Sequence, residues 1–152
     1  MAEIGRKGKV IIIVFGILVL FSMNRVIGRS LAFVGKCDGL FDRPNRVWSF
    51  YNCGGFTRYF IDELLGAGAV TFDNVILTMG NSLPETIYRH ELAHTRQYSI
   101  LGPAFLPLYG AAHLVAWVDS KIEGYQNPHA GNIFEIRADQ DAGLAAEPKI
   151  LK

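Results

Sequence analysis

Apolar residues form one long uninterrupted run near the amino terminus and recur at strand and helix spacings further along the chain. Residues 10–23 read VIIIVFGILVLFSM, without a charge or a proline, and three basic residues precede them. A basic start followed by an apolar run is typical of secretory and membrane-targeting segments. A full span needs about 20 residues, so we expect the segment to continue to residue 27, with Arg25 reaching back to the interface. The alternative, a buried helix of a soluble domain, fits less well because the run has no polar face.

The same segment lacks a convincing cleavage site. The small-x-small triplet Ser30-Leu31-Ala32 lies well past the apolar run and beside Arg29. We therefore predict an uncleaved anchor that places residues 10–27 in the lipid bilayer of a single-pass membrane protein. Lysine and arginine are equally frequent on the two sides of the run, so the positive-inside rule does not set the orientation. The leading basic cluster favours a cytoplasmic amino terminus and an extracytoplasmic domain.

The middle of the chain alternates turn formers with short apolar pieces. Residues 36–58 are rich in aromatic and turn residues, which predicts irregular structure with short strands. Residues 59–66 predict a short helix that ends at a glycine. Residues 69–79 contain two β-rich pieces around Asp73-Asn74. Because Asp and Asn tolerate the positive φ of a tight turn, these pieces predict a β-hairpin, with one bent strand as the alternative.

Two later segments carry helix signals. The first begins at Ser82, which forms a capping-box pattern with Glu85, and ends before Gly102. Apolar and histidine side chains recur in it every three or four residues, so one stripe of this helix should face inward. The second covers residues 132–142, from a capping asparagine to a terminating glycine.

Composition limits the classes of function. The chain has 152 residues, of which 50% are hydrophobic and 19% charged, with a formal net charge of +1. Because it has no basic stripe, we expect no nucleic acid as a partner. Cys37 and Cys53 would pair in a disulfide if the domain is exported, or stay reduced in the cytosol. We divide the chain into an anchor (residues 1–30), a folded domain (31–143) and a carboxy-terminal tail (144–152).

The first of the two helices contains the motif His90-Glu91-Leu92-Ala93-His94, which carries the chemistry. Histidines four residues apart lie on one helix face and can offer ring nitrogens to the same ion. The glutamate between them cannot reach the same coordination position, but it can take a proton from a metal-bound water. The motif therefore predicts Zn²⁺ held by His90 and His94, with Glu91 as the catalytic general base. A solvated or hydrogen-bonded patch is the alternative, which an inward-facing stripe disfavours.

A catalytic zinc site needs a third protein ligand. Glu135 is the preferred candidate, because Glu135 and Asp139 form a carboxylate pair at i and i+4 on the second helix. Glu135 would bind the ion, and Asp139 would hold the N–H of a ligand histidine. A capping role for Glu135 is the alternative, since it stands three residues after the capping asparagine. His129, in a turn-rich loop, is the rival ligand, whereas His113 sits in an apolar run and is expected to be a core residue.

These residues carry a resemblance to known proteins. The HExxH motif followed by ExxxD resembles the gluzincin metallopeptidases, which implies His90, His94 and Glu135 as zinc ligands, Glu91 as general base and Asp139 as their support. The string RHELAHTRQYSILGPAFLPLYG, followed by NIFEIRAD, also resembles a family of small uncharacterised bacterial membrane-associated proteins with a HELxHxxQ…LGPxFLPxY…NxFE pattern. That resemblance implies the same ligand set and a bacterial inner membrane, but no substrate.

A second apolar stretch, residues 99–118, is long enough to suggest another membrane span. A single crossing would separate His94 from Glu135 by about 30 Å, whereas ligands must approach one ion to about 2 Å. We therefore expect a core helix, broken at its prolines and at Gly110, that also touches the bilayer. A re-entrant hairpin is the alternative.

Together these patterns predict an α+β fold. It would be a minimal zincin-like domain, with the HExxH helix, a second ligand helix and a small β-hairpin or sheet, behind one amino-terminal transmembrane helix. The predicted function is that of a membrane-anchored zinc-dependent metallopeptidase acting on a peptide or protein substrate. The hairpin at 69–79 would offer that peptide an edge strand. The alternatives are a zinc hydrolase of another amide or ester, and a non-catalytic membrane protein with a structural or relic zinc site.

Overall fold

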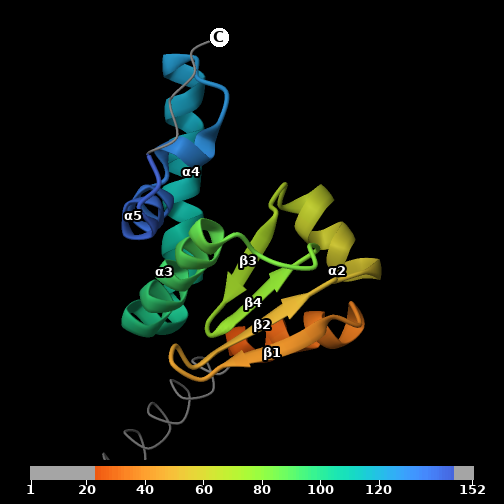
Figure 1. The fold of residues 1–152 in the computed structure, drawn as a ribbon. Coiled ribbons are helices and arrows are strands. Elements are labelled where there is room, and N and C mark those ends of the chain that lie inside the picture. Colours follow the sequence, from red (N-terminus) through yellow and green to blue (C-terminus); the bar gives the residue numbers. More distant parts are fainter. Residues whose placement is uncertain (1–22, 146–152) are drawn as a thin grey trace, which may run out of the picture.

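The computed structural model describes residues 23–145 and has an α+β architecture (Figure 1). A four-stranded sheet organises the first half of this part, and three helices, α3 to α5, make up most of the second. After a helix over residues 23–34, the elements are β1 (Asp38–Asp42), β2 (Val47–Tyr51), α2 (Gly55–Tyr59), a π-helical turn (Phe60–Leu64), β3 (Ala69–Phe72), β4 (Val75–Thr78), α3 (Glu85–Leu101), a 3₁₀ turn (Gly102–Ala104), α4 (Phe105–Glu123), a second 3₁₀ turn (Pro128–Gly131) and α5 (Ile133–Ala142).

The sheet has the strand order β1-β2-β4-β3. β1–β2 and β3–β4 are antiparallel pairs, whereas β2 and β4 run parallel. The predicted hairpin at 69–79 is confirmed: Phe72 pairs with Val75, and the turn residue Asp73 adopts a φ of 58°. Because β3 is last in this order, its outer edge pairs with no other strand of residues 23–145.

Both faces of the sheet are covered, so all four residues of β4 are buried. Side chains alternate between the two faces along a strand. Val75 and Leu77 face the helix over residues 23–34 and the π-helical turn, whereas Ile76 faces α3. The first cluster comprises Ala32, Cys53, Ile61, Phe72, Val75 and Leu77, and the second comprises Val47, Ile76 and Leu92. Burial of Leu92 fixes α3 against the sheet. It thereby sets the direction in which the side chains of the motif His90–His94 point.

The helix over residues 23–34 belongs to this folded unit. Its buried residues Asn24, Gly28 and Ala32 recur every four positions and face the sheet. A Cβ at Gly28 would lie 2.9 Å from the Cβ of Val75, so the glycine permits this close packing. The predicted domain boundary at residue 30 falls inside this helix.

Two predictions about the ends of the chain lie largely outside the described residues. The predicted anchor over residues 10–27 overlaps the described part only from residue 23 onward. The predicted tail over residues 144–152 overlaps it only at 144 and 145. Asn24 is buried and Arg25 pairs with Asp73 of the β3–β4 turn, so the predicted extension of the anchor to residue 27 is wrong. The rest of both segments stays a prediction.

Cys37 and Cys53 form a disulfide, with their Cα atoms 4.4 Å apart. The bond joins the residue before β1 to the chain just after β2, across a sequence separation of 16. The sequence had left a disulfide and two free thiols open, and the structure has the disulfide. It therefore closes the β1–β2 hairpin covalently at the end opposite its turn.

The two predicted ligand helices are present, with one difference at the start of α3. This helix begins at Glu85, and no side chain caps it. The predicted capping box is therefore wrong, and the Ser82 hydroxyl donates to the neighbouring asparagine instead. α5 follows its prediction: Asn132 caps its first turn, and Gly143 ends it in the left-handed conformation, with a φ of 73°.

α4 differs most from its prediction. We expected a core helix broken at Pro103, Pro107 and Gly110, but the chain bends once, at Gly102–Ala104, and α4 continues through the later two residues. Pro107 lies in the first turn of α4, where its missing N–H costs no helical hydrogen bond. Most side chains of α4 are exposed. The expectation of a buried helix is therefore wrong for its outward face.

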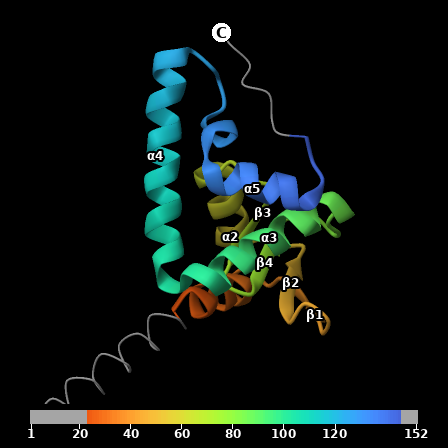
Figure 2. The same ribbon diagram turned by 90° about the vertical axis from the view of Figure 1, so that its left-hand side faces the viewer.

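The stretch Glu85–Glu123, which comprises α3 and α4, is long and apolar enough to cross a membrane by length and composition. It is not one straight rod, because α3 and α4 meet at a sharp angle (Figure 2). After α4 the chain returns, and the second 3₁₀ turn and α5 lie on the same side of α4 as α3 does. The segments before and after α4 are therefore close together.

Candidate metal centre

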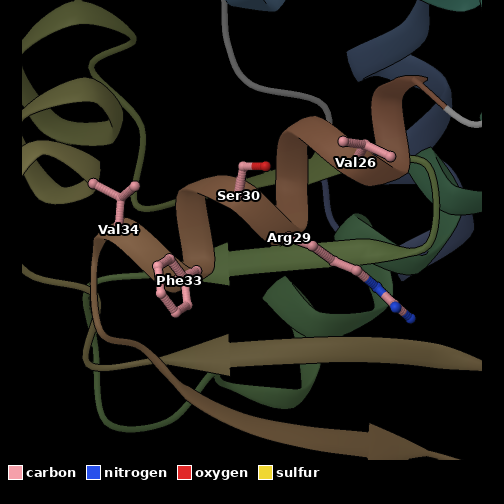
Figure 3. A pocket seen from close by; sticks show the side chains of 5 residues that line it. All are labelled: Val26, Arg29, Ser30, Phe33 and Val34. Carbon is pink, nitrogen blue, oxygen red and sulfur yellow. The ribbon is translucent and has the colours of Figure 1, made fainter.

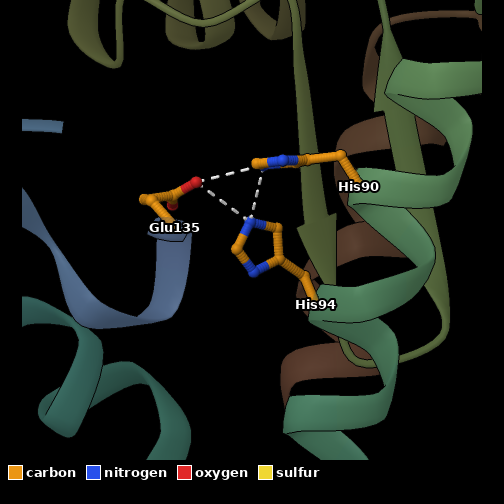
Figure 4. A group of neighbouring side chains, drawn as sticks. All are labelled: His90, His94 and Glu135. Atoms are coloured by element: carbon orange, nitrogen blue, oxygen red, sulfur yellow. Dashed lines mark hydrogen bonds and ion pairs between the residues drawn. The ribbon is translucent and has the colours of Figure 1, made fainter. Parts of the chain in front are cut away.

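α3 and α5 pack against each other and direct three metal-ligating side chains towards one point (Figure 4). His90 and His94 are one turn apart on α3, and Glu135 comes from the first turn of α5. Nε2 of His90 lies 3.1 Å from Nε2 of His94, and Oε2 of Glu135 lies 3.0 and 3.3 Å from these nitrogens. The ligand atoms of the three residues all lie within 4.8 Å of one another, so the group can hold a metal ion.

The second ring nitrogen of each histidine has its own partner. Nδ1 of His90 lies 2.8 Å from Oδ1 of Asp139, and Nδ1 of His94 lies 2.9 Å from Oε1 of Gln97. The Gln97 amide is oriented in turn, because it donates to the carbonyl of Phe134 at 2.9 Å. Since both acceptors are oxygens, each Nδ1 is assigned the proton. Each Nε2 then keeps the lone pair that a metal needs.

Glu135 has one oxygen engaged and one available. The hydroxyl of Tyr109, on α4, donates to Oε1 at 2.5 Å. The Glu135 side chain is only 3% exposed, and three imidazole nitrogens approach Oε2, yet none makes a hydrogen bond to it. A buried carboxylate oxygen without a hydrogen bond is costly, and a coordinated cation removes that cost.

The spacing of these atoms fits a small tetrahedral metal ion. Metal bonds of about 2.0–2.1 Å in tetrahedral geometry put neighbouring ligand atoms about 3.3–3.4 Å apart. The three separations in the cluster are 3.0, 3.1 and 3.3 Å. In addition, two unprotonated imidazole nitrogens that face each other at 3.1 Å repel unless a cation lies beside both. The residues present therefore fit a metal with three protein ligands.

The electrostatics of the site favour positive charge. Burial opposes the charged form of His90, but the close contact with the Glu135 carboxylate and the charges of Glu91, Glu135 and Asp139 outweigh it and raise the pKa of His90 to about 9. Burial likewise opposes a charge on His94, and Glu135 again reverses the effect and raises its pKa. Burial alone would raise the pKa of Glu135, but the surrounding imidazoles lower it below its usual range. The carboxylates thus make this interior favourable for a cation.

Glu91 lies on the same helix, beside the ligand cluster. It is 6% exposed, and its Oε2 accepts a hydrogen bond of 2.6 Å from the hydroxyl of Thr71 on β3. Its charge acts on both His90 and His94. A carboxylate that is close to the metal ligands, but held by the edge strand, can exchange protons beside the ion without binding it.

Two further histidines, His129 and His113, were considered as possible metal ligands. Nε2 of His129 lies 3.0 Å from Oε2 of Glu135, and its side chain is 40% exposed. It is not one of the three residues whose ligand atoms converge, so the arrangement favours Glu135 as third ligand. His113 is exposed on α4, with its ring stacked on Tyr109 at a centroid distance of 6.4 Å. The expectation of a core position for His113 is therefore wrong.

Three residues that organise the site were not predicted. They are Thr71, Gln97 and Tyr109. Gln97 follows His94 by three residues and so lies on the same helix face, a spacing that could have identified it. Thr71 comes from a strand, and no sequence spacing connects it to the motif. Tyr109 comes from another helix and stands in the LGPxFLPxY part of the resemblance pattern, which gives it no contact with the ligands. Only the packing of β3 and α4 beside α3 and α5 brings them to it.

The surface hollow in Figure 3 is a separate feature. It is lined by Val26, Arg29, Ser30, Phe33 and Val34 of the helix over residues 23–34. None of these side chains is an imidazole or a carboxylate, so the hollow offers no comparable set of metal ligands.

Comparisons of the chain with protein-family models, with curated proteins and with solved structures gave no match. The resemblance to gluzincins therefore rests on the motif residues alone. The chemistry of the site is the basis for assigning a function.

Proposed function

We propose that this protein is a membrane-anchored zinc-dependent metallopeptidase. The observation that carries the proposal is the convergence of two imidazole nitrogens and one buried carboxylate oxygen, from His90, His94 and Glu135, beside the buried carboxylate of Glu91. Two histidines and one glutamate are the ligand set of well-known zinc hydrolases, and three protein ligands leave a fourth position for water or substrate. The same residues carry the resemblance to gluzincins.

The protein side of the reaction follows from the position of each residue. Zinc, when bound, polarises the substrate carbonyl and acidifies a coordinated water. Glu91 accepts the proton of the attacking water and passes it to the leaving amine. Asp139 and Gln97 hold the two imidazole rings so that their Nε2 atoms stay directed at the ion. Tyr109 holds Glu135 by the oxygen that does not face the histidines.

The substrate class follows from the edge strand. β3 is last in the sheet order, and Thr71 of this strand donates to Glu91. An extended peptide that pairs with an open strand edge gains backbone hydrogen bonds, and pairing here would bring its backbone towards Glu91. Peptide hydrolysis is therefore favoured over hydrolysis of another amide or ester.

The location follows from two features. The apolar residues 10–22 of the predicted anchor, which precede the folded helix, are proposed to hold the chain in the lipid bilayer. The disulfide between Cys37 and Cys53 supports an extracytoplasmic domain, because disulfides persist in oxidising compartments. We therefore propose a single-pass protein with its domain outside the cytoplasm, in keeping with the inner-membrane location that the bacterial resemblance implies.

One observation favours a second candidate function. Nε2 of His129 lies 3.0 Å from the Glu135 oxygen that would bind the metal. If His129 moved onto the ion it would be a fourth protein ligand, and a zinc site closed by four protein ligands is structural rather than catalytic. The alternative is therefore a non-catalytic membrane protein stabilised by zinc.

The test measures metal content and peptide hydrolysis in the same full-length variants, purified in detergent. Wild-type protein should hold about one zinc per chain, and His94→Ala and Glu135→Ala should lose it. Glu91→Gln should keep the metal and lose about 10²–10⁴-fold in hydrolysis rate. Glu85→Gln is the matched control: it is on the same helix, and its side chain is 70% exposed, so both properties should be unchanged.

Three results separate the alternatives. Wild-type protein without metal, or unchanged metal affinity in Glu135→Ala, would overturn the site. Metal lost in His129→Ala, together with no hydrolysis by wild type, would support the structural alternative. Hydrolysis of small amide or ester substrates, but of no peptide, would mean that the protein is a zinc hydrolase of another amide or ester.

A further inference from the structure

α4 exposes many apolar side chains and buries few. Its buried residues are Phe105, Ala116 and Ser120, and Tyr109 reaches Glu135 from the same side of the helix. Its outward face is apolar, with exposed fractions from 44% to 79% for Leu108, Leu114, Val115, Trp117, Val118 and Ile122. Figure 2 shows that α4 forms one outer side of the molecule, so this face has no neighbour within the described residues.

The chain is free of charge along almost the whole of this face. Residues 97–118 contain no Asp, Glu, Lys or Arg. In the last turn Lys121 is exposed, with its Nζ 5.6 Å from the centre of the Trp117 ring, and Glu123 at the helix end is exposed as well. A tryptophan and a lysine at the end of an apolar face are typical of a membrane–water interface, where the ring and the ammonium group reach the headgroups.

The helix over residues 23–34 begins close to the base of α4 (Figure 2). Arg25, near the first described residue, makes an ion pair of 2.9 Å with Asp73. Burial, and to a lesser degree the charge of Asp73, raises the pKa of Tyr98 on α3. The Tyr98 ring in turn packs on Phe105, the first residue of α4, with centroids 4.1 Å apart. The first described residues, which directly follow the apolar run in the sequence, therefore lie near the start of the exposed apolar helix.

We propose that the outward face of α4 lies in the lipid bilayer, so that the domain rests on the membrane through α4 as well as through its anchor. A helix of this kind places its apolar face about 5–10 Å into the boundary between headgroups and acyl chains. A bilayer fits this face better than a second protein copy does. Between Leu106 and Val118 the exposed polar groups are His113, whose ring stacks on Tyr109, and the Trp117 indole near the end of the face. The other exposed side chains are apolar and give a protein partner few hydrogen bonds to fix its register.

This inference shares only the membrane location with the proposed function and needs no metal. It deepens the earlier expectation that residues 99–118 touch the bilayer, because it assigns the contact to one face of α4. The opposite face stays with the site through Tyr109 and Glu135. The ligand cluster would then lie behind a helix whose other side is in lipid.

The two tryptophans of the chain, Trp48 and Trp117, provide the test. The full-length protein is reconstituted in phosphatidylcholine–phosphatidylglycerol vesicles, with or without bromine atoms on the upper acyl chains. In Trp48→Phe the emission comes from Trp117, which is 46% exposed on α4, and in Trp117→Phe it comes from Trp48 on β2. Such a helix is immersed by about 5–10 Å, which is the depth of the bromine atoms on the upper acyl chains. Brominated lipid should therefore reduce the emission of Trp117 about twofold or more. Trp48 emission should be nearly unchanged.

Two outcomes would overturn the proposal. Quenching of Trp117 by aqueous iodide, but not by brominated lipid, would place the face in water. Protection of Trp117 from both quenchers would mean that protein covers the face, either residues 10–22 or a second copy. The zinc content of both variants is measured in parallel, so that loss of the metal site and loss of the lipid contact are distinguished.

Discussion

The sheet half and the helical half of this molecule are built in opposite ways. In the sheet half the interior is apolar: Val47, Ile61, Val75, Ile76 and Leu77 are each at most 1% exposed. In the helical half the interior holds polar groups: Glu91, His94, Asn132, Glu135 and Asp139 are each at most 9% exposed. The outward face of α4 is meanwhile apolar.

The difference shows what each half needs in order to be stable. Burial of apolar side chains stabilises the sheet half without any further component. Buried carboxylates and imidazoles are costly unless they are partnered, and Oε2 of Glu135 has no hydrogen bond. The proposed ion inside and the proposed lipid neighbour outside would each offset a cost that the sheet half does not have.

Metal removal should have the largest effect and should act on one half only. A ligand present at 1,000 times its dissociation constant stabilises the fold by about 4 kcal/mol, so chelation should lower the free energy of unfolding by about that amount. Amide hydrogen exchange should speed up in α3 and α5, which carry the ligands, and stay slow in β2 and β4. A uniform rise in exchange over both halves would contradict the comparison.

Leu77→Ala should damage the sheet half alone. Leu77 is 0% exposed in β4, and truncation of a buried leucine costs about 2–5 kcal/mol. Chemical denaturation of the metal-loaded protein measures this loss, and zinc affinity should stay the same. Leu40→Ala is the matched control, because Leu40 lies in the same sheet and is 63% exposed. Equal losses in the two variants would mean that the sheet has no such core.

Asp139→Asn should weaken the metal site by a smaller amount. Removing the carboxylate that holds a ligand histidine costs about 10–100-fold in metal affinity. Competition with a zinc-binding dye measures the change. Asp141→Asn, an exposed position on the same helix, should leave the affinity unchanged. If both variants behave like wild type, Asp139 does not orient His90.

Leu114→Ala should have the smallest effect on stability. Leu114 points outward from α4 and is 60% exposed, so the free energy of unfolding in detergent should change by no more than about 0.5 kcal/mol. This loss is compared with that of Leu77→Ala. The residue type and the substitution are the same, so the difference reports how deeply each leucine is buried. A loss of more than about 2 kcal/mol would show that other parts of the chain bury this face.

The sequence predicted the elements that depend on local signals. The hairpin turn at Asp73, the helix end at Gly102 and the Asn132 cap were read from residues whose conformational preferences act over a few positions. The cluster of His90, His94 and Glu135 was also expected, since the i, i+4 spacing and the need for a third ligand restrict the choice. Its metal and its activity stay predictions.

What the sequence did not predict depends on packing between distant elements. Thr71 and Tyr109 reach the site only because β3 and α4 lie beside the two ligand helices. Ser82 matched a capping pattern, but the backbone at Pro84 begins the helix without it. The apolar stretch of α4 predicted burial, because hydrophobicity alone does not distinguish a protein interior from a lipid neighbour.

The hydroxyl of Tyr109 has a consequence for thermodynamic linkage. It ties α4, whose far side is proposed to face lipid, to Glu135, a proposed metal ligand. Under these two proposals α4 takes part in two equilibria, one with the bilayer and one with the metal ion. Any factor by which lipid binding changes zinc affinity must equal the factor by which zinc changes lipid binding. Zinc titrations in vesicles of different lipid composition would measure this coupling free energy directly.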